Sequence, residues 1–319
     1  MALMSGRIRL LLIVLVLCSI MSVLFALDLC FAQQKTPFAL QVGFTQMEGM
    51  GKLKQIQDLF WSPAKNRLLV TDTGNNRLLF FGDSEGKFRF LSEFKSDKMA
   101  LPISAVETGR GTIIVIERGA QGIISYNTET GERRGVLADG FPDASSFWPT
   151  CLALDDKDNL YVVDQGNQRI YIFDGNLTYK LHINPPEPRF TGFSAVAVAK
   201  DGNIVALEAR RGIVYLFDNE GKIIRQFSKR GDLRGETEFP VDIAVDGQGR
   251  IYVLDSHRHQ IVLLDRNGNW QGEIGEKGWK EGKFIFPCRV EVASDYRLFI
   301  VDADNNRLQV FIPAGRAEQ

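Results

Sequence analysis

The sequence predicts an all-β protein: a six-bladed β-propeller with four antiparallel strands in each blade. An apolar run that ends in an acidic residue occurs six times, and the acids are Asp72, Glu117, Asp164, Glu208, Asp255 and Asp302. Their intervals are 45, 47, 44, 47 and 47 residues, a period typical of propellers and other repeat arrays. Each interval holds several short apolar runs bounded by turn residues, which leaves no room for a helix.

The fifth unit shows the strands of a blade most clearly. Its four apolar runs cover residues 239–246, 251–255, 260–264 and 270–274, and Gly, Asn, Asp and Ser fill the gaps between them. Runs of Val, Ile, Leu and Tyr between such residues are typical of strands joined by tight turns. A four-stranded meander has two faces to bury, and copies packed around an axis bury both.

The repeated motif resembles that of the NHL repeat family. An apolar run leads to an Asp in Val70–Phe81, Val162–Phe173, Val253–Leu264 and Ile300–Phe311, and an Asn and an Arg follow the Asp in all of these stretches except Val253–Leu264. The linkers Gly231–Pro240 and Gly275–Phe284 match the family as well. The second and fourth units depart from the pattern, because Glu replaces Asp and the Asn and Arg are missing. The resemblance covers about residues 37 to 313 and also implies six blades.

The ends of the chain predict how the ring closes. The sixth unit ends near Ile312 after only three strands, and a spare apolar run, Phe38–Phe44, precedes the first unit. We expect this N-terminal strand to become the outer strand of the last blade, which would remove an exposed sheet edge.

The first residues have the pattern of an export signal. Arg7 and Arg9 precede an apolar run from about Leu10 to Leu27, and small residues lead to a cleavage site after Ala32. Residues 1–32 are therefore expected to be a signal peptide, with an uncleaved membrane anchor as the alternative, and residues 33–319 the propeller. We expect a monomeric protein that is exported to the periplasm, the extracellular space or the outer envelope. It would meet a membrane only if the segment stays uncleaved.

Composition limits the partners and the redox chemistry. The formal net charge is −1, which gives no strong field for nucleic acid, so no nucleic-acid partner is expected. Two cysteines, Cys151 and Cys288, remain after the signal and belong to the third and sixth units. These units would lie opposite each other in the ring, too far apart for a disulfide.

The variable positions at the start of each inner strand are the first candidates for a site. They lie on the face where the inner strands begin, which we call the top face, around the central channel. When a one-residue insertion is allowed in the first and fourth units, the position two places after the repeat's proline is occupied by Asp58, Ser104, Cys151, Ser194, Asp242 and Arg289. Arg289 would lie between Asp242 and Asp58. These three could form a paired plug in the channel, or a polar pocket for a small ligand or cation.

The acidic residues of the repeat also have two interpretations. They could form a ring of ligands for a bound molecule or ion, or each could cap a loop by accepting hydrogen bonds from its backbone. An Asp at a strand end often accepts backbone N–H groups of the next loop. Because Asp72, Asp164, Asp255 and Asp302 recur in four blades, a shared structural role is favoured. The turns between the first and second strands, on the opposite face, are expected to be only structural.

A second group of candidates could bind a partner on the top face, either a protein or an extended polymer. The aromatic and basic residues expected there are Arg210, Arg211, His257, Arg258, His259, Trp148 and Trp279. His257 and His259 could also hold a metal, but no acid or cysteine spacing completes a site. The metal therefore stays unknown and no cofactor is predicted, with a divalent cation at the channel mouth as the alternative.

These observations lead to two functional hypotheses. The first is a non-catalytic, exported scaffold that binds a protein or ligand through its top face. The alternative is a metal-dependent enzyme, a lyase or a lactonase-like hydrolase, with its site at the central channel. That alternative is implied by a resemblance in outline to other six-bladed propellers.

Overall fold

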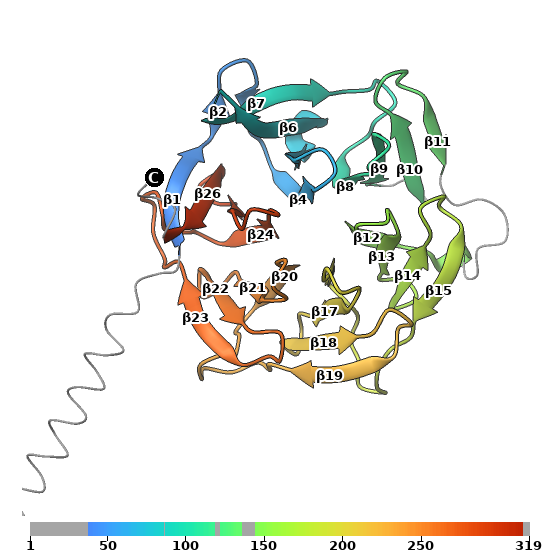
Figure 1. Ribbon diagram of the computed structural model, residues 1–319, viewed down its shortest axis with the longest axis vertical. Coiled ribbons are helices and arrows are strands. Elements are labelled where there is room, and N and C mark those ends of the chain that lie inside the picture. The colour runs from blue at the N-terminus through green and yellow to red at the C-terminus, as the bar shows by residue number, and fades with distance from the viewer. Residues whose placement is uncertain (1–37, 86, 119–121, 136–143, 315–319) are drawn as a thin grey trace, which may run out of the picture. The chain divides into compact units, whose positions relative to one another are not determined.

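The computed structural model describes residues 38–85, 87–118, 122–135 and 144–314, and these residues form a ring of six four-stranded sheets (Figure 1). The expected signal segment, residues 1–32, lies outside the described residues. Within the described part of the chain, no helix has the length and apolar character needed to cross a bilayer.

Each blade is a meander from an inner to an outer strand. The inner strands are β4 (Ile56–Ser62), β8 (Pro102–Glu107), β12 (Pro149–Leu154), β16 (Ala195–Val198), β20 (Pro240–Val245) and β24 (Pro287–Val292). The second strands are β5 (Arg67–Asp72), β9 (Thr112–Glu117), β13 (Leu160–Asp164), β17 (Ile204–Glu208), β21 (Ile251–Asp255) and β25 (Leu298–Asp302). The third strands are β6 (Arg77–Ser84), β10 (Ile123–Asn127), β14 (Arg169–Phe173), β18 (Ile213–Phe217), β22 (Gln260–Leu264) and β26 (Arg307–Pro313). The outer strands are β7 (Lys87–Phe94), β11 (Arg133–Gly135), β15 (Tyr179–Ile183), β19 (Ile223–Phe227), β23 (Trp270–Ile274) and β1 (Phe38–Phe44).

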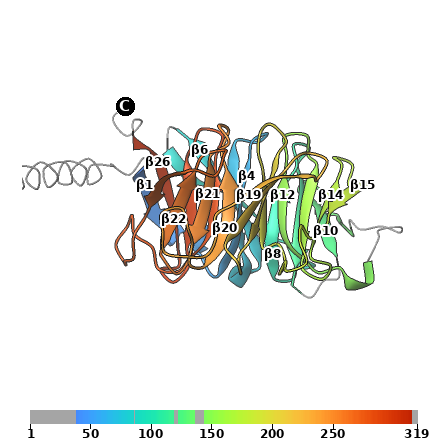
Figure 2. The same ribbon diagram turned by 90° about the horizontal axis from the view of Figure 1, so that it is seen from below.

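The remaining elements are short, and all but one lie between blades. Those between blades are the two-residue strands β2 (Gln46–Met47) and β3 (Gly51–Lys52) and the 3₁₀ turn η2 (Ala144–Ser146). The 3₁₀ turn η1 (Thr73–Asn75) instead joins β5 to β6 within the first blade. Each inner strand contacts the inner strand of the next blade, and β24 contacts β4. Figure 2 shows the blades side by side, with their strands running between the two faces of the ring. The predicted six-bladed propeller is therefore confirmed.

Closure by the N-terminal strand is confirmed as well. β1 pairs antiparallel with β26, from Phe38 opposite Pro313 to Phe44 opposite Leu308, with a bulge between Leu40 and Val42. The rings of Phe38 and Phe44 are buried, so β1 contributes to the core as well as to the sheet. Since the first strand of the chain completes the last blade, that blade has its full set of four strands.

The hydrophobic core consists of layers between adjacent blades rather than one central cluster. The layer between the last and first blades illustrates the packing. Trp61 stacks on Phe299 with ring centroids 5.7 Å apart, and the Arg297 guanidinium lies over Trp61. Arg297 is nearly buried and donates two hydrogen bonds to Asp83, of 2.9 and 2.7 Å. The blades thus bury both sheet faces, as the meander requires.

The repeated acids act as caps. Asp302 is fully buried and accepts hydrogen bonds from the Ile285 backbone N–H at 2.7 Å and from the side chains of Asn305, Arg307 and Gln309. Asp72 accepts hydrogen bonds from the Lys54 N–H, Asn75 and Arg77 in the same way. Further examples are Asp164, which accepts from the Trp148 N–H, and Asp255, which accepts from the Phe239 N–H. The structural interpretation of these acids is confirmed.

The second and fourth units, which depart from the motif, form the same kind of cap with the longer side chain of a glutamate. Glu208 is buried and accepts from the Thr191 N–H at 3.0 Å and from the Tyr215 hydroxyl at 2.8 Å. Glu117 likewise accepts from the Ala100 N–H and the Tyr126 hydroxyl. In these two blades the acid accepts a hydrogen bond from a tyrosine hydroxyl of the third strand, whereas Asp72 and Asp302 accept one from the arginine that begins that strand.

Candidate functional site

A cavity of about 660 Å³ occupies the central channel. Its upper end is formed by Asp58, Cys151 and Asp242, near the starts of three inner strands. From there it follows the inner strands down to the turns that join them to the second strands, including residues 62–64, 155–158, 199–200, 246–247, 293–294 and 296. These turns lie on the face opposite the top face, which we call the lower face.

The lower face therefore contributes to the cavity wall, which differs from the expectation that its turns are only structural. The sequence pattern could not reveal this, because the turns share their Asp, Asn and Gly residues with ordinary hairpin turns. Asp155 does cap its own turn, accepting hydrogen bonds from the backbone N–H groups of Lys157 and Asn159, both at 2.9 Å. The same turn also lines the cavity.

Asp58 links three blades at the upper end of the cavity. It is buried and accepts hydrogen bonds from the Ser104 hydroxyl at 2.6 Å and the Ala105 N–H at 3.2 Å, both in the second blade. The Nε atom of Arg289, in the sixth blade, lies 3.4 Å from its Oδ1. Burial raises the pKa of Asp58 above its ordinary value, and the Arg289 charge and the Ser104 hydrogen bond oppose that rise.

Asp242 occupies the matching position in the fifth blade. It is buried and accepts a hydrogen bond of 2.9 Å from the Val290 N–H of the next blade. Burial raises the pKa of Asp242 to about 6, although the charge of Arg289 opposes the rise. Burial also disfavours the charged form of Arg289, but the carboxylates of Asp242 and Asp58 raise its pKa above the ordinary value. Arg289 therefore favours the ionised forms of both carboxylates, whereas the charge of Asp58 disfavours the ionised form of Asp242.

The expected group of Asp58, Asp242 and Arg289 is thus found at the channel. Arg289 is not part of the cavity wall, whereas both carboxylates are. The structure contains features of both sequence interpretations, since a paired set of charges lies at the upper end and an open polar cavity lies below it.

Sequence reasoning missed Glu291, which lies two residues after Arg289 on the same inner strand and lines the cavity. Its Oε1 accepts a hydrogen bond of 2.8 Å from the Val292 N–H. Burial raises the pKa of Glu291 to about 8, and the negative charges of Asp242 and Asp58 add to the effect. The alternation of two charged residues along an inner strand was the available signal.

The other candidates at the channel have structural roles. Ser104 donates to Asp58 and accepts from the Leu152 N–H at 3.1 Å, which ties three successive blades together. Ser194 donates to the Leu207 carbonyl at 3.1 Å, within its own blade, and does not line the cavity. Cys151 is a free thiol in the cavity wall, and burial raises its pKa to about 12. Such a thiol stays protonated and is a poor nucleophile.

Among the described residues, no group of three or more His, Cys, Asp or Glu side chains is placed to hold a metal ion. The two top-face histidines do not converge. His259 is buried and its Nδ1 accepts a hydrogen bond of 3.0 Å from the Phe286 N–H, whereas His257 is exposed and stacks on Phe239 with centroids 4.5 Å apart. The residues present do not fit the divalent cation that the alternative hypothesis implies.

The candidates for a partner surface separate into exposed and paired groups. Trp148 and Trp279 are 69% and 74% exposed, and Arg210 is also exposed. Arg211 pairs with Glu187 at 2.7 Å, and Arg258 donates to the Glu236 and Gly231 carbonyls. That this face binds a protein or polymer stays a prediction.

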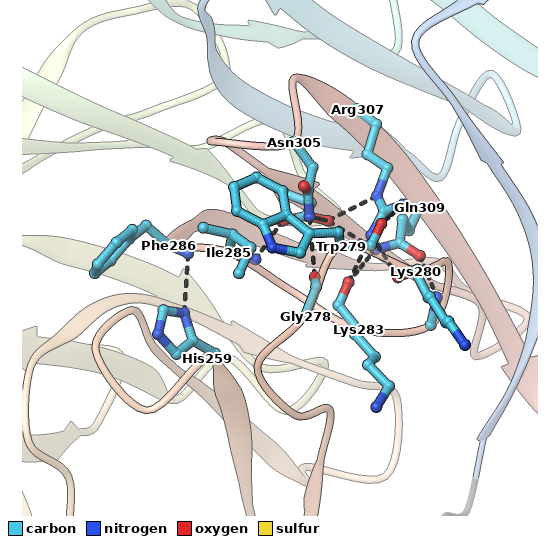
Figure 3. A network of polar contacts seen from close by, with 12 residues as sticks. His259, Gly278, Trp279, Lys280, Lys283, Ile285, Phe286, Asn305, Arg307 and Gln309 are labelled. Atoms are coloured by element: carbon cyan, nitrogen blue, oxygen red, sulfur yellow. Dashed lines mark hydrogen bonds and ion pairs between the residues drawn. The ribbon is translucent and has the colours of Figure 1, made fainter.

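Figure 3 shows how the linker that carries Trp279 is held. Arg307 donates to the backbone carbonyls of Trp279, Lys280 and Lys283, at 3.0, 2.7 and 2.8 Å. Asn305 donates to the Gly278 carbonyl at 3.2 Å. The backbone of this linker is therefore fixed while its indole remains exposed to solvent.

Comparisons with known proteins agree with this architecture. The model of the NHL repeat family matches residues 237–262, within the fifth blade, which confirms the expected resemblance to NHL repeats at this unit. A search of curated proteins finds no significant match.

Solved structures share the fold at low identity. A virginiamycin B lyase from Staphylococcus aureus, an inactive variant with quinupristin, is 15% identical with a TM-score of 0.58, over 84% of this chain and 83% of that one. A streptogramin B lyase is 14% identical with a TM-score of 0.57, over 81% and 78%. A gluconolactonase from Xanthomonas campestris is 12% identical with a TM-score of 0.60, over 88% and 95%. At this identity the similarity establishes the fold.

The first functional hypothesis requires correction. A non-catalytic scaffold was expected because the sequence showed no convergent catalytic group. The solved structures compared above are lyases and a gluconolactonase, which favours the enzyme alternative. That expectation considered Asp58, Asp242 and Arg289 at the channel and left out Glu291, which also lines the cavity.

Proposed function

We propose that this protein is an enzyme that hydrolyses small esters or lactones in the central cavity by general acid–base catalysis. The observation that carries the proposal is a cavity of about 660 Å³ whose wall holds two carboxyl groups with pKa values raised to about 8 and about 6. A pair of carboxyl groups with separated pKa values can divide the acid and base roles at neutral pH. The volume is in the usual range for small-molecule sites.

Glu291 is the hydrogen-bond donor to the substrate in this proposal. With a pKa of about 8 its carboxyl group is mostly protonated at neutral pH, so it can donate a hydrogen bond to a substrate carbonyl oxygen. That bond strengthens as negative charge develops on the oxygen during attack. The backbone hydrogen bond from Val292 to Oε1 fixes the carboxyl group and leaves Oε2 for the substrate.

Asp242 is the general base. With a pKa of about 6 it is mostly ionised at neutral pH and can take a proton from the attacking water. Oxygen of that water bonds to the carbonyl carbon, the ester C–O bond breaks, and the departing alkoxide receives the proton from Asp242. The positive charge of Arg289 lowers the pKa values of Asp242 and Asp58 and so favours the ionised forms of both carboxylates.

Hydrolysis of a panel of neutral esters and lactones by the purified protein tests this proposal. The dependence of kcat/KM on pH should be bell-shaped, with limbs near the two pKa values. Glu291→Gln and Asp242→Asn should each lower kcat/KM by roughly 10²-fold or more. Glu273→Gln, at an exposed position of an outer strand, should change nothing. An inert wild-type protein, or a Glu291→Gln variant of unchanged activity, would overturn the proposal.

We also propose that the protein is exported, which the charge and apolar pattern of residues 1–32 supports. Fractionation of the producing cells, followed by N-terminal sequencing of the protein, tests this. A new N-terminus at Gln33 is expected, and full-length protein in the cytosol would contradict it.

A further inference from the structure

Exposed apolar side chains gather on the top face of the ring. Nine large apolar side chains are exposed in the described part of the chain, and six of them lie in top-face loops. Four of the six occupy the position immediately before the proline that begins an inner strand, and they are 42% to 69% exposed: Leu101, Trp148, Phe239 and Phe286. Because the inner strands surround the channel (Figure 1), we call these four residues the apolar collar. The other two, Leu233 and Trp279, lie in the linkers that lead to Phe239 and Phe286.

The fold does not require apolar side chains at the collar. The Trp148 N–H donates to Asp164 at 2.6 Å, and the Trp148 carbonyl accepts from the Gln165 N–H at 2.9 Å, so the backbone is fixed while the indole stays in solvent. In the first blade the equivalent position, just before Ile56, holds an exposed Gln55. A polar residue therefore fits this place in the repeat. Apolar residues collected on one face, rather than scattered, mark an interaction surface.

Charge is distributed unevenly between the two faces. The described residues of the top-face loops, between blades and between second and third strands, include fifteen basic and nine acidic side chains. Those of the lower-face loops include eight basic and thirteen acidic side chains. The near-neutral net charge of the chain, −1, therefore conceals a positive top face and a negative lower face. Such a distribution turns the top face toward a negatively charged surface.

The composition of the top face favours a lipid surface over a protein. Eight of its fifteen basic residues are lysines, which are depleted at protein–protein interfaces. Near an anionic bilayer, each lysine or arginine strengthens binding about fivefold. Tryptophan, phenylalanine and leucine beside basic residues are typical of segments that lie in the bilayer interface. Trp279 and Lys280 form such a pair in a linker whose backbone is held by Arg307 (Figure 3).

We propose that the top face docks on an anionic lipid bilayer. The apolar collar, Leu233 and Trp279 insert between the head groups, and the lysines and arginines around them pair with lipid phosphates. This docking is separate from the proposed hydrolysis and does not use residues 1–32, because residues from Phe38 onward form all six sheets. The chain that begins at Gln33 contains the whole docking surface, so docking in this way brings the cleaved protein to a membrane.

Sedimentation with lipid vesicles tests this proposal on the chain that begins at Gln33. Vesicles of equal parts phosphatidylcholine and phosphatidylglycerol should bind the protein at least about tenfold more tightly than vesicles of phosphatidylcholine alone, and added salt should reduce this advantage. Phosphatidylcholine brominated on its acyl chains, mixed into the anionic vesicles, should quench the fluorescence of Trp148 and Trp279, because both indoles enter the bilayer interface.

Removal of exposed apolar surface has a matched control on the rim of the ring. Trp148→Gln combined with Trp279→Gln should weaken binding to the anionic vesicles at least about tenfold, and its first change copies the glutamine that the first blade has at this position. Ile223→Gln combined with Ile224→Gln also removes two exposed apolar side chains, from the outer strand β19, and should change the affinity less than about twofold.

Removal of charge has a matched control on the lower face. Lys277→Gln combined with Lys280→Gln, both in one top-face linker, should weaken binding about tenfold at low salt. Lys65→Gln combined with Lys222→Gln removes the same charge from two lower-face turns and should leave the affinity nearly unchanged. All four lysines are exposed, so these changes do not disturb the core.

Several results would overturn the docking proposal. They are no binding to anionic vesicles at low salt, equal binding to both kinds of vesicle, and equal losses within a matched pair of variants. Soluble polyglutamate that binds the top face as tightly as the vesicles do, with no quenching by the brominated lipid, would indicate an acidic protein as the occupant and would also overturn it. Hydrolysis of a soluble ester should be unchanged in both top-face variants, so the docking and the proposed hydrolysis can fail separately.

Discussion

Replacing Glu291 by Gln should change how the stability of the protein depends on pH. Burial and two neighbouring carboxylates raise the pKa of Glu291 from 4.5 to about 8. Between these two values the folded protein holds a proton that the unfolded chain has released. Stability therefore falls as pH rises through this window, by about 1.4 kcal/mol for each pH unit well below the folded pKa.

The magnitude can be worked out for a practical pH range. From pH 6 to pH 8 the wild-type protein should lose about 2 kcal/mol of unfolding free energy through Glu291, because the slope decreases as the folded pKa is approached. Gln cannot ionise and has nearly the same shape. The variant should match the wild type near pH 4, and exceed its stability by about 2 kcal/mol at pH 6 and by about 4 kcal/mol at pH 8.

Urea unfolding followed by tryptophan fluorescence, at pH 6 and at pH 8, measures this difference. Glu273→Gln is the control, since it removes an exposed carboxylate of an outer strand and should keep the wild-type pH dependence. Equal pH dependence in the wild type and in Glu291→Gln would show that Glu291 titrates normally. The acid role assigned to it would then be lost.

Two further predictions concern the caps and the ring closure. Asp302→Ala should cost about 3–5 kcal/mol, because it leaves the guanidinium of Arg307 buried without its partner, whereas Asp304→Ala at an exposed position should stay within about 0.5 kcal/mol. Phe38→Ala should cost about 3–5 kcal/mol, because the ring is buried in the closing strand, whereas Ile224→Ala, at a side chain 52% exposed, should cost far less. Urea unfolding of the two variants in each pair measures these differences. Similar losses of unfolding free energy for the two members of a pair would contradict the assigned contacts.

The fold could be predicted because it depends on local repetition. The same acid caps the same loop in each blade, so its interval in the sequence equals the length of a blade. Asp302 and Asp72 have equivalent hydrogen bonds although more than two hundred residues separate them. The closing strand could also be predicted, because Phe38–Phe44 was the apolar run that no unit used and the last unit lacked a strand.

The site could be predicted only in part. Aligning the repeats placed Arg289 near Asp58, because equivalent positions meet around the channel. Glu291 and the cavity itself depend on how far each side chain extends into the channel and on which ones leave space below Arg289. How far each side chain reaches into the channel follows from the packing of several inner strands, and no local sequence pattern encodes it. The raised pKa of Glu291 arises from the same burial.

The most direct test of the acid role is a titration of the Glu291 carboxyl carbon by NMR, in protein labelled with carbon-13 at glutamate and assigned with Glu291→Gln. A midpoint near pH 8, clearly above the glutamate value of 4.5, is the predicted result. A midpoint close to that ordinary value would show an ionised carboxylate at neutral pH and would contradict the proposed mechanism.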